Sequence, residues 1–139
     1  MKIFLYFIGK PKDAQANALA AEYMKRASRY APSTMVEIRP DRFDPWAKHP
    51  NGRKIMLDPA GKPLDLNGFA QLFSAAEMKG HDLVFAVGGH DGLPEDWRRR
   101  ADLLLSLSSM TMPHELARVV VAEQIYRAFT ILRGHPYPR

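Results

Sequence analysis

DLVFAVGG, residues 82–89, is a short apolar run that ends in two glycines. Strands with one face in water alternate apolar and polar residues, whereas strands covered on both faces of a parallel sheet are continuously apolar. Residues 82–89 follow the second pattern and therefore predict a buried strand. Similar runs predict further strands at 2–9, 35–39, 54–58 and 102–108.

Helical patterns lie between these strands. Residues 13–31 begin at Asp13, a residue type that caps helices, and place Leu19, Tyr23 and Ala27 at spacings of four. Residues 67–79 begin at Asn67 and repeat Phe69, Phe73 and Ala76. Pro94 begins a short third helix, and Pro113 lies in the first turn of a long one. The alternation of strands and helices predicts an α/β fold, mainly a parallel sheet with helices on both faces.

The segment 40–52, PDRFDPWAKHPNG, carries three prolines and has no usable period. It is predicted to be a surface loop. No repeat or linker indicates a second domain, and 139 residues bury about two thirds of their unfolded surface in one core. We therefore expect one domain, residues 1–139. The apolar start KIFLYFIG, residues 2–9, is too short for a signal peptide core or a membrane span, so a cytoplasmic protein is expected.

The charge balance is basic. The formal net charge is +5, with Lys and Arg in excess in residues 1–62 and 94–139 and acidic residues in excess in 63–93. A basic chain favours a polyanionic partner such as nucleic acid, although many domains carry such a charge for solubility alone. The arginines 98–100 are most simply a solvated helix face, with phosphate contact as the alternative.

Several catalytic classes are excluded by the residues present. The chain has no cysteine, which removes disulfides, thiolate nucleophiles and cysteine-ligated metals. HELAR, residues 114–118, is similar to the zinc motif HExxH, but Arg118 stands where the second imidazole is needed and cannot ligate zinc. No metal site is expected. The serines near residue 108 lack the GxSxG turn of serine hydrolases.

The glycines of FAVGGHDGL, residues 85–93, follow a predicted strand. Glycines at the carboxyl end of such a strand let backbone approach a ligand closely, so a cofactor loop and a simple tight turn are both open. GGHDG does not match GxGxxG, and no P-loop is present.

The long helix carries charges on apolar faces. Glu123 and Arg127 have the i, i+4 order that favours pairing, and His114 and Arg118 lie among apolar residues of another stripe. Buried charges need such partners. We expect this helix to be covered by its own sheet and by a second subunit, with an internal salt bridge that only fixes packing as the alternative for Glu123 and Arg127.

Four segments carry a family resemblance: LDPAGKPL (57–64), FAVGGHDGL (85–93), LSLSSMTMPHELARVVVAEQIYRA (105–128) and RGHPYPR (133–139). In this order, over nearly the whole chain, they closely resemble the small bacterial ribosomal methyltransferases of the SPOUT superfamily, RlmH type. The block running from LSLSSMTMPH into EQIYRA is highly specific.

The resemblance implies an α/β SPOUT methyltransferase fold whose C-terminal part forms a trefoil knot, and a homodimer. It implies methyl transfer from S-adenosyl-L-methionine to N3 of a pseudouridine in 23S rRNA of assembled ribosomes. Cofactor-binding positions carry over to a set of apolar, glycine and hydroxyl residues: Leu57, Gly88, Leu107, Ser108, Ser109, Met110, Thr111 and Met112.

The proton on N3 must be lost before or during methyl transfer, so a general base is expected. His114, His135 and Tyr137 are candidate catalytic residues by chemistry and by position. Four arginines are assigned to RNA phosphate contact or to holding the dimer's site together: Arg118, Arg127, Arg133 and Arg139.

Two departures from the family pattern bear on activity. Pro138 stands where the family has histidine in a PYH ending, and only the segment 40–52 fills the place of a helix between the second and third strands. An alternative function is therefore a catalytically weak ribosome- or RNA-binding relative. A weaker third reading, a nucleotide-binding oxidoreductase, lacks the acidic residue expected after GxGxxG.

Overall fold

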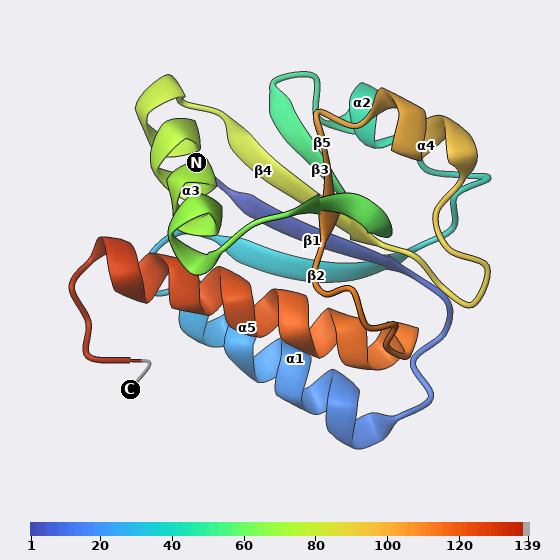
Figure 1. Cartoon of the computed structure of the whole chain (residues 1–139), viewed down its shortest axis with the longest axis horizontal. Coiled ribbons are helices and arrows are strands. Elements are labelled where there is room, and N and C mark those ends of the chain that lie inside the picture. Colours follow the sequence, from blue (N-terminus) through green and yellow to red (C-terminus); the bar gives the residue numbers. More distant parts are fainter. Residues whose placement is uncertain (138–139) are drawn as a thin grey trace.

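The computed structural model describes residues 1–137 of the chain (Figure 1). Five strands form one sheet in which every pairing between strands is parallel, in the order β2-β1-β4-β3-β5. The strands are β1 (Ile3–Ile8), β2 (Ser33–Ile38), β3 (Gly52–Pro63), β4 (Asp82–Val87) and β5 (Leu103–Ser106). The predicted α/β class is confirmed.

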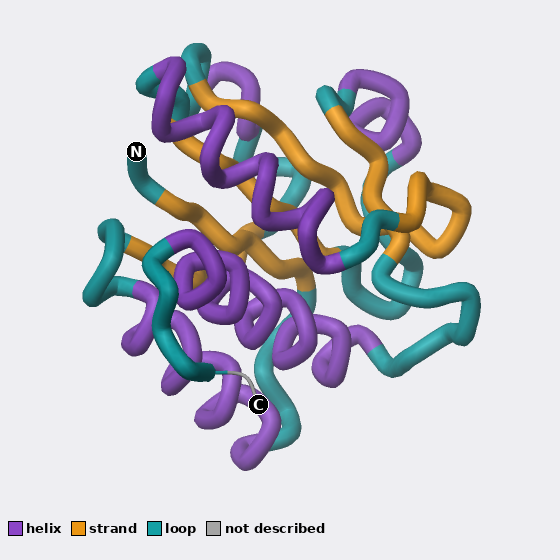
Figure 2. Tube along the Cα trace, turned by 60° about the vertical axis from the view of Figure 1, so that its left-hand side comes forward, coloured by secondary structure: helices purple, strands orange, loops and turns teal. Residues whose placement is uncertain are grey.

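Helices cover both faces of the sheet, as expected. The longer helices α1 (Ala14–Ala27), α3 (Leu66–Lys79) and α5 (His114–Leu132) pack on one face, and Figure 2 shows α1 and α5 side by side. The short helices α2 (Pro45–Lys48) and α4 (Glu95–Arg100) lie with the second, smaller core on the other face.

The larger core is dense in aromatic rings. Phe73 of α3 lies 5.1 Å from Phe129 of α5 and 6.0 Å from Phe85 of β4, measured between ring centroids, and all three side chains are fully buried. Truncating a ring of this kind costs about 3–5 kcal/mol because the cavity it leaves does not collapse. This core fixes α3 and α5 relative to the carboxyl ends of the strands.

The prediction of a surface loop over 40–52 is wrong in part. Asp44 caps the four-residue helix α2 by accepting a hydrogen bond from the Trp46 N–H at 3.0 Å, and Pro45 occupies its first turn. His49 is buried and bonded through Nε2 to the Tyr6 hydroxyl at 2.6 Å. Burial lowers the pKa of His49 and raises the pKa of Tyr6. A helix of one turn is too short to show a period.

The helix starts were predicted with mixed success. Asp13 caps α1 as expected, since its carboxylate accepts from the Ala16 N–H at 3.0 Å. Asn67 does not cap α3; Asp65 does, by accepting from the Gly68 N–H at 2.7 Å. Two residues separate these two candidate caps, and only the backbone geometry distinguishes them.

β3 is longer than predicted, and its pairing with β5 shifts register. Leu105 pairs with Leu57 before a register shift in β3 and with Lys62 after it. A Cβ at Gly61 would lie 2.6 Å from the Leu104 carbonyl carbon, so only glycine permits this approach. The segment 58–61 thus passes against β5, and the end of β3 is held near the start of the loop that follows β5.

Candidate cofactor site at the carboxyl ends of β3 and β4

A cavity of about 280 Å³ opens where β3, β4 and β5 end. Three segments supply most of its walls: residues 57–59 of β3, just beyond its pairing with β4, the glycine turn after β4, and the loop between β5 and α5. Its lining residues are Leu57, Asp58, Pro59, Val87, Gly88, Gly89, His90, Gly92, Leu107, Ser108, Met110, Thr111, Met112, His114 and Ala117. Ligands of open α/β sheets bind at this end of the strands.

The turn after β4 requires glycine, because a side chain at these positions would collide with neighbouring backbone. A Cβ at Gly88 would lie 2.5 Å from the backbone carbonyl carbon of Gly92, and a Cβ at Gly89 would lie 3.0 Å from the Ile8 carbonyl oxygen. Gly92 itself has φ +76°, a conformation that other residues adopt only with strain. The turn therefore presents bare backbone N–H and C=O groups to the cavity.

Serine hydroxyls shape the loop between β5 and α5. The Ser106 hydroxyl donates to the Ser108 carbonyl at 3.1 Å, and the Ser108 hydroxyl accepts from the Met110 N–H at 3.0 Å. These bonds fold the loop against the ends of the strands. Seven of the eight predicted cofactor residues line the cavity, and Ser109, which is exposed, is not among them.

The cavity suits a cofactor with an apolar ring and polar edges. Leu57, Val87 and Leu107 supply apolar walls, and the glycine turn supplies backbone hydrogen-bonding groups. Adenine is recognised by such a combination without any charged partner. The residues present therefore fit S-adenosylmethionine.

His114 is the one predicted catalytic residue that lines this cavity. It is the first residue of α5, and Pro113 precedes it as the N-cap. Its side chain is half-buried and lines the cavity. It lies at the positive end of the α5 dipole.

Arg118 was assigned either to RNA phosphate contact or to holding the site together, and its burial is incompatible with the first of these roles. Its side chain is 0% exposed, and its guanidinium donates to the carbonyls of Ile8 and Gly9, both at 3.1 Å. It lies 4.0 Å over the Phe7 ring. Burial lowers the pKa of Arg118, yet arginine stays charged in proteins. A helical pattern shows which stripe a residue occupies and not how deep it is buried.

Glu115 completes a clamp around the loop between β1 and α1. Its carboxylate accepts from the backbone N–H of Lys12 at 2.6 Å and of Asp13 at 3.2 Å, and it lies 3.6 Å from Arg118. The Lys12 N–H is the main reason that the pKa of Glu115 falls to about 2. Glu115 and Arg118 together fix α5 to the end of β1, next to the glycine turn. No sequence pattern indicated a role for Glu115.

A second polar cluster, around Glu123, lies farther along α5. Arg127 donates to Glu123 at 2.9 Å, which confirms the predicted pair, and the Tyr137 hydroxyl also donates to Glu123 at 2.5 Å. Burial is the main reason that the pKa of Tyr137 is raised, and the hydrogen bond to Glu123 adds to it. The chain after α5 turns back along the helix end, where Tyr137 packs on Tyr126 at 4.7 Å between ring centroids (Figure 1).

His135 and Tyr137 do not line the cavity of their own chain. Arg133 is exposed and paired with Glu77 at 2.8 Å. Pro138 and Arg139 lie outside the described residues. The arginines 98–100 are exposed, as predicted, and each has an acidic neighbour, with Arg98 reaching Asp58 at 3.3 Å.

Several lining residues were not predicted, among them Asp58, Pro59, Val87 and His90. Each lies within two positions of a predicted one, and strand ends with adjoining glycines were the signal that could have found them. Among residues 1–137, no group of three or more His, Asp and Glu side chains could hold a metal ion. None of the helices within this range has the length and apolar character that a bilayer crossing requires.

Solved structures with the same fold include methyltransferases. A methylase family protein from Neisseria gonorrhoeae aligns with a TM-score of 0.64 at 12% identity, over 91% of this chain and 82% of that one. The SpoU methyltransferase AviRb from Streptomyces viridochromogenes, in complex with the cofactor AdoMet, aligns with a TM-score of 0.55 at 14% identity, over 91% of this chain and 57% of that one.

Sequence relatives are much closer. The chain is 66% identical over 139 residues to a protein of Solibacter usitatus named ribosomal RNA large subunit methyltransferase H, with both chains covered completely. It is 39% identical to a protein of the same name from Koribacter versatilis, over 99% of this chain and 97% of that one. The model of a family described as predicted SPOUT methyltransferase matches residues 1–138. The chain belongs to the SPOUT methyltransferase family.

Proposed function

We propose that this protein transfers a methyl group from S-adenosylmethionine to N3 of a pseudouridine in 23S rRNA of assembled ribosomes. The observation that carries the proposal is the cavity at the carboxyl ends of β3 and β4, which brings the glycine turn and the loop 107–112 together. The names of the close relatives supply the substrate class, large-subunit ribosomal RNA.

Two parts of the site hold the cofactor in this proposal. The apolar walls and the backbone at Gly88 bind the adenine end, and the loop 107–112 closes over the rest, with Met110 exposed at its tip. The sulfonium of S-adenosylmethionine supplies an already activated methyl group. The protein therefore mainly has to place the acceptor nitrogen in line and exclude water.

A general base has to take the proton from N3, and His114 is our first candidate. Its place at the rim of the cavity supports this role, because a base must lie within hydrogen-bond reach of the acceptor. His135 and Tyr137 remain candidates only if a second subunit brings them to the cavity, since they lie elsewhere in their own chain.

A homodimer is part of the proposal. Leu116, Val120, Glu123 and Arg127 fall on one stripe of α5, and none of them is fully buried, with Leu116 48% exposed. An apolar stripe with a paired charge favours a subunit interface over open solvent. Across such an interface the tail of one subunit would complete the site of the other.

Arg127, Arg133 and Arg139 are proposed to contact RNA phosphates near this shared site. Arg127 and Arg133 both have an acidic partner in the chain, and phosphate contact would require each to share or exchange that partner. We propose further that the single domain 1–139 acts in the cytoplasm, where assembled ribosomes are found.

A C-terminal trefoil knot is also proposed. Its support is the register shift between β3 and β5, in which Leu105 pairs with residues on both sides of the segment 58–61. The close approach of Gly61 to Leu104 belongs to the same feature. Threading of this kind is rare in proteins.

The experiment is methyl incorporation from labelled S-adenosylmethionine into ribosomes purified from cells that lack this activity. Label in 23S rRNA and none in 16S rRNA is expected. Binding of the cofactor without any incorporation would favour the alternative, a ribosome-binding relative with weak activity. Tighter binding of NAD than of S-adenosylmethionine would contradict the proposal altogether.

A further inference from the structure

We propose that a second cavity, at the opposite end of the sheet, binds a backbone phosphate of the RNA substrate. This inference rests on the proposed function. The cavity has a volume of about 380 Å³ and lies where β3 and β4 begin, at the paired residues Gly52 and Asp82. Five residues of strand separate these from Leu57 and Val87 at the cofactor cavity, a distance of about 17 Å.

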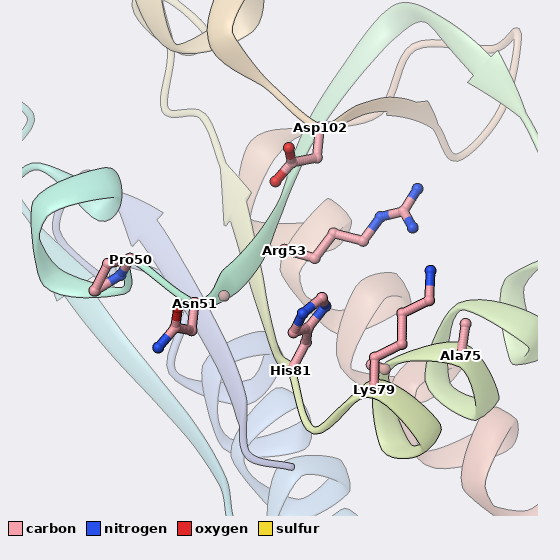
Figure 3. Close-up of a pocket in the computed structure, with 9 residues that line it drawn as sticks. Pro50, Asn51, Arg53, Ala75, Lys79, His81 and Asp102 are labelled. Atoms are coloured by element: carbon pink, nitrogen blue, oxygen red, sulfur yellow. The ribbon is translucent and has the colours of Figure 1, made fainter.

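Two cationic side chains and an imidazole converge on this cavity from separate elements. Arg53 comes from the start of β3, Lys79 from the end of α3, and His81 from the turn before β4. Figure 3 shows the Arg53 and Lys79 side chains extending toward the same space. Two like charges pointing into one space repel each other unless an anion lies between them.

No acidic partner explains this arrangement within residues 1–137. Neither Arg53 nor Lys79 has a carboxylate within 4.0 Å, and the buried Nε of Arg53 lacks a hydrogen-bond partner. An unpaired buried donor on a charged group costs free energy, which a bound oxygen ligand would recover. Asp102, the carboxylate at this cavity, is already held at 2.7 Å by the Lys54 N–H and points away from Arg53 in Figure 3.

The chemistry of the lining indicates a phosphate group and not a nucleobase. The planar guanidinium of Arg53 offers paired donors that match two phosphate oxygens, and Lys79 adds a point charge. Within residues 1–137, no Phe, Tyr or Trp side chain lines the cavity, and the imidazole of His81 is its one aromatic ring. A substrate that reaches both cavities must extend well beyond its reacting base, and a ribosomal RNA does so.

The test compares two double variants of equal charge. Arg53→Gln/Lys79→Gln removes the cations of this cavity. Lys25→Gln/Arg29→Gln removes two exposed cations near the end of α1, neither of which has an ion pair within the described residues. Affinity for ribosomes is measured by filter binding at several KCl concentrations, and S-adenosylmethionine affinity and thermal unfolding are measured alongside.

The cavity variant is expected to bind ribosomes about tenfold more weakly than the control and to lower the slope of log Kd against log salt by about one, as the loss of one phosphate contact requires. Cofactor affinity should not change. Methyl transfer by the wild-type protein reports on the proposed function, whereas the difference between the two variants reports on this cavity.

Inorganic phosphate, titrated while the amide resonances of Arg53 and His81 are followed, separates two sources of the anion. Shifts in the wild-type protein only, together with the loss of ribosome affinity in the variant, support an RNA phosphate. Phosphate binding with equal ribosome affinities of the two variants would overturn the RNA assignment. Equal affinities with no phosphate binding would overturn the site itself.

Discussion

Gly88 and Arg118 illustrate what a residue pattern can and cannot reveal. The sequence predicted that the glycines after residue 87 turn the chain, and left a cofactor loop and a simple tight turn both open. The structure places these glycines at a cavity. The sequence could not show that Arg118 is buried beneath the loop after β1, since that contact joins residues 109 positions apart. The family resemblance identified the loop 107–112 as a cofactor-binding segment. It did not show how deeply residues of the adjoining helix, such as Arg118, are buried.

Replacing Gly88 with alanine should abolish tight cofactor binding. The new Cβ would lie 2.5 Å from the Gly92 backbone, so the turn must move. We expect S-adenosylmethionine affinity, measured by calorimetry, to fall by at least about tenfold, or ~1.4 kcal/mol. Gly80→Ala is the control, because Gly80 also has a positive φ, +70°, but open space around it and no contact with the cavity. It should lose about 1 kcal/mol of stability and no affinity. Equal affinities for the two variants would contradict this role of the turn.

The low pKa of Glu115 predicts that the stability of the fold depends on pH. Its pKa in the folded protein is about 2, against an ordinary value of 4.5, so the charged carboxylate stabilises the fold above pH 4.5. That contribution is lost as the pH falls from 4.5 to 2, because the unfolded state takes up the proton first. Urea unfolding of wild type and Glu115→Gln should therefore differ at pH 7 and converge toward pH 2. Glu22→Gln, at an exposed ion pair, should change the free energy of unfolding by less than about 1 kcal/mol. The account would be ruled out if the free energies of unfolding of wild type and Glu115→Gln differed by the same amount at pH 7 and at pH 2.

At the scale of elements, apolar runs identified all five strands and glycine and proline marked several ends. The four-residue helix α2 was missed because one turn has no measurable period. The extension of β3 through DPAGKP was missed because proline, glycine and lysine in series are typical of a turn. Pairing with β5 holds this segment extended, and such pairing is a tertiary contact that no local pattern contains.

The clamp between α5 and the loop after β1 should contribute strongly to stability. Arg118→Met removes the buried guanidinium and leaves the carbonyls of Ile8 and Gly9 without their donor. We expect the free energy of unfolding to fall by about 3 kcal/mol, with faster amide exchange at residues 9–13. Arg26→Met, at an exposed i, i+4 pair, should cost less than about 1 kcal/mol. If the free energy of unfolding fell by the same small amount in both variants, the buried Arg118 guanidinium would not stabilise the fold.

At the scale of the whole molecule, the sheet places one cavity at each end of β3 and β4. The α/β class and the presence of helices on both faces could be predicted from the alternation of patterns. The strand order β2-β1-β4-β3-β5 could not, because it depends on which edges pair in space. The order matters for function, since it brings the ends of β3 and β4 beside the loop that follows β5.

Subunit association is predicted to depend on the exposed stripe of α5. Leu116→Glu places a charge at the most exposed apolar residue of this stripe and should convert a dimer to a monomer in analytical ultracentrifugation. The rate of methyl transfer should also decrease in this variant if the tail of one subunit completes the site of the other. Met78→Glu, at a position 85% exposed on α3, should leave the mass unchanged. A dimeric Leu116→Glu variant would place the interface elsewhere.

The most direct test of the central claim is to locate the transferred methyl group. Ribosomes from cells that lack the activity are incubated with the protein and labelled S-adenosylmethionine, and the digested 23S rRNA is analysed by mass spectrometry. A single labelled nucleotide, identified as pseudouridine methylated at N3, is the predicted result, and it should be absent with Gly88→Ala. Label on another base, or on 16S rRNA, would contradict the account.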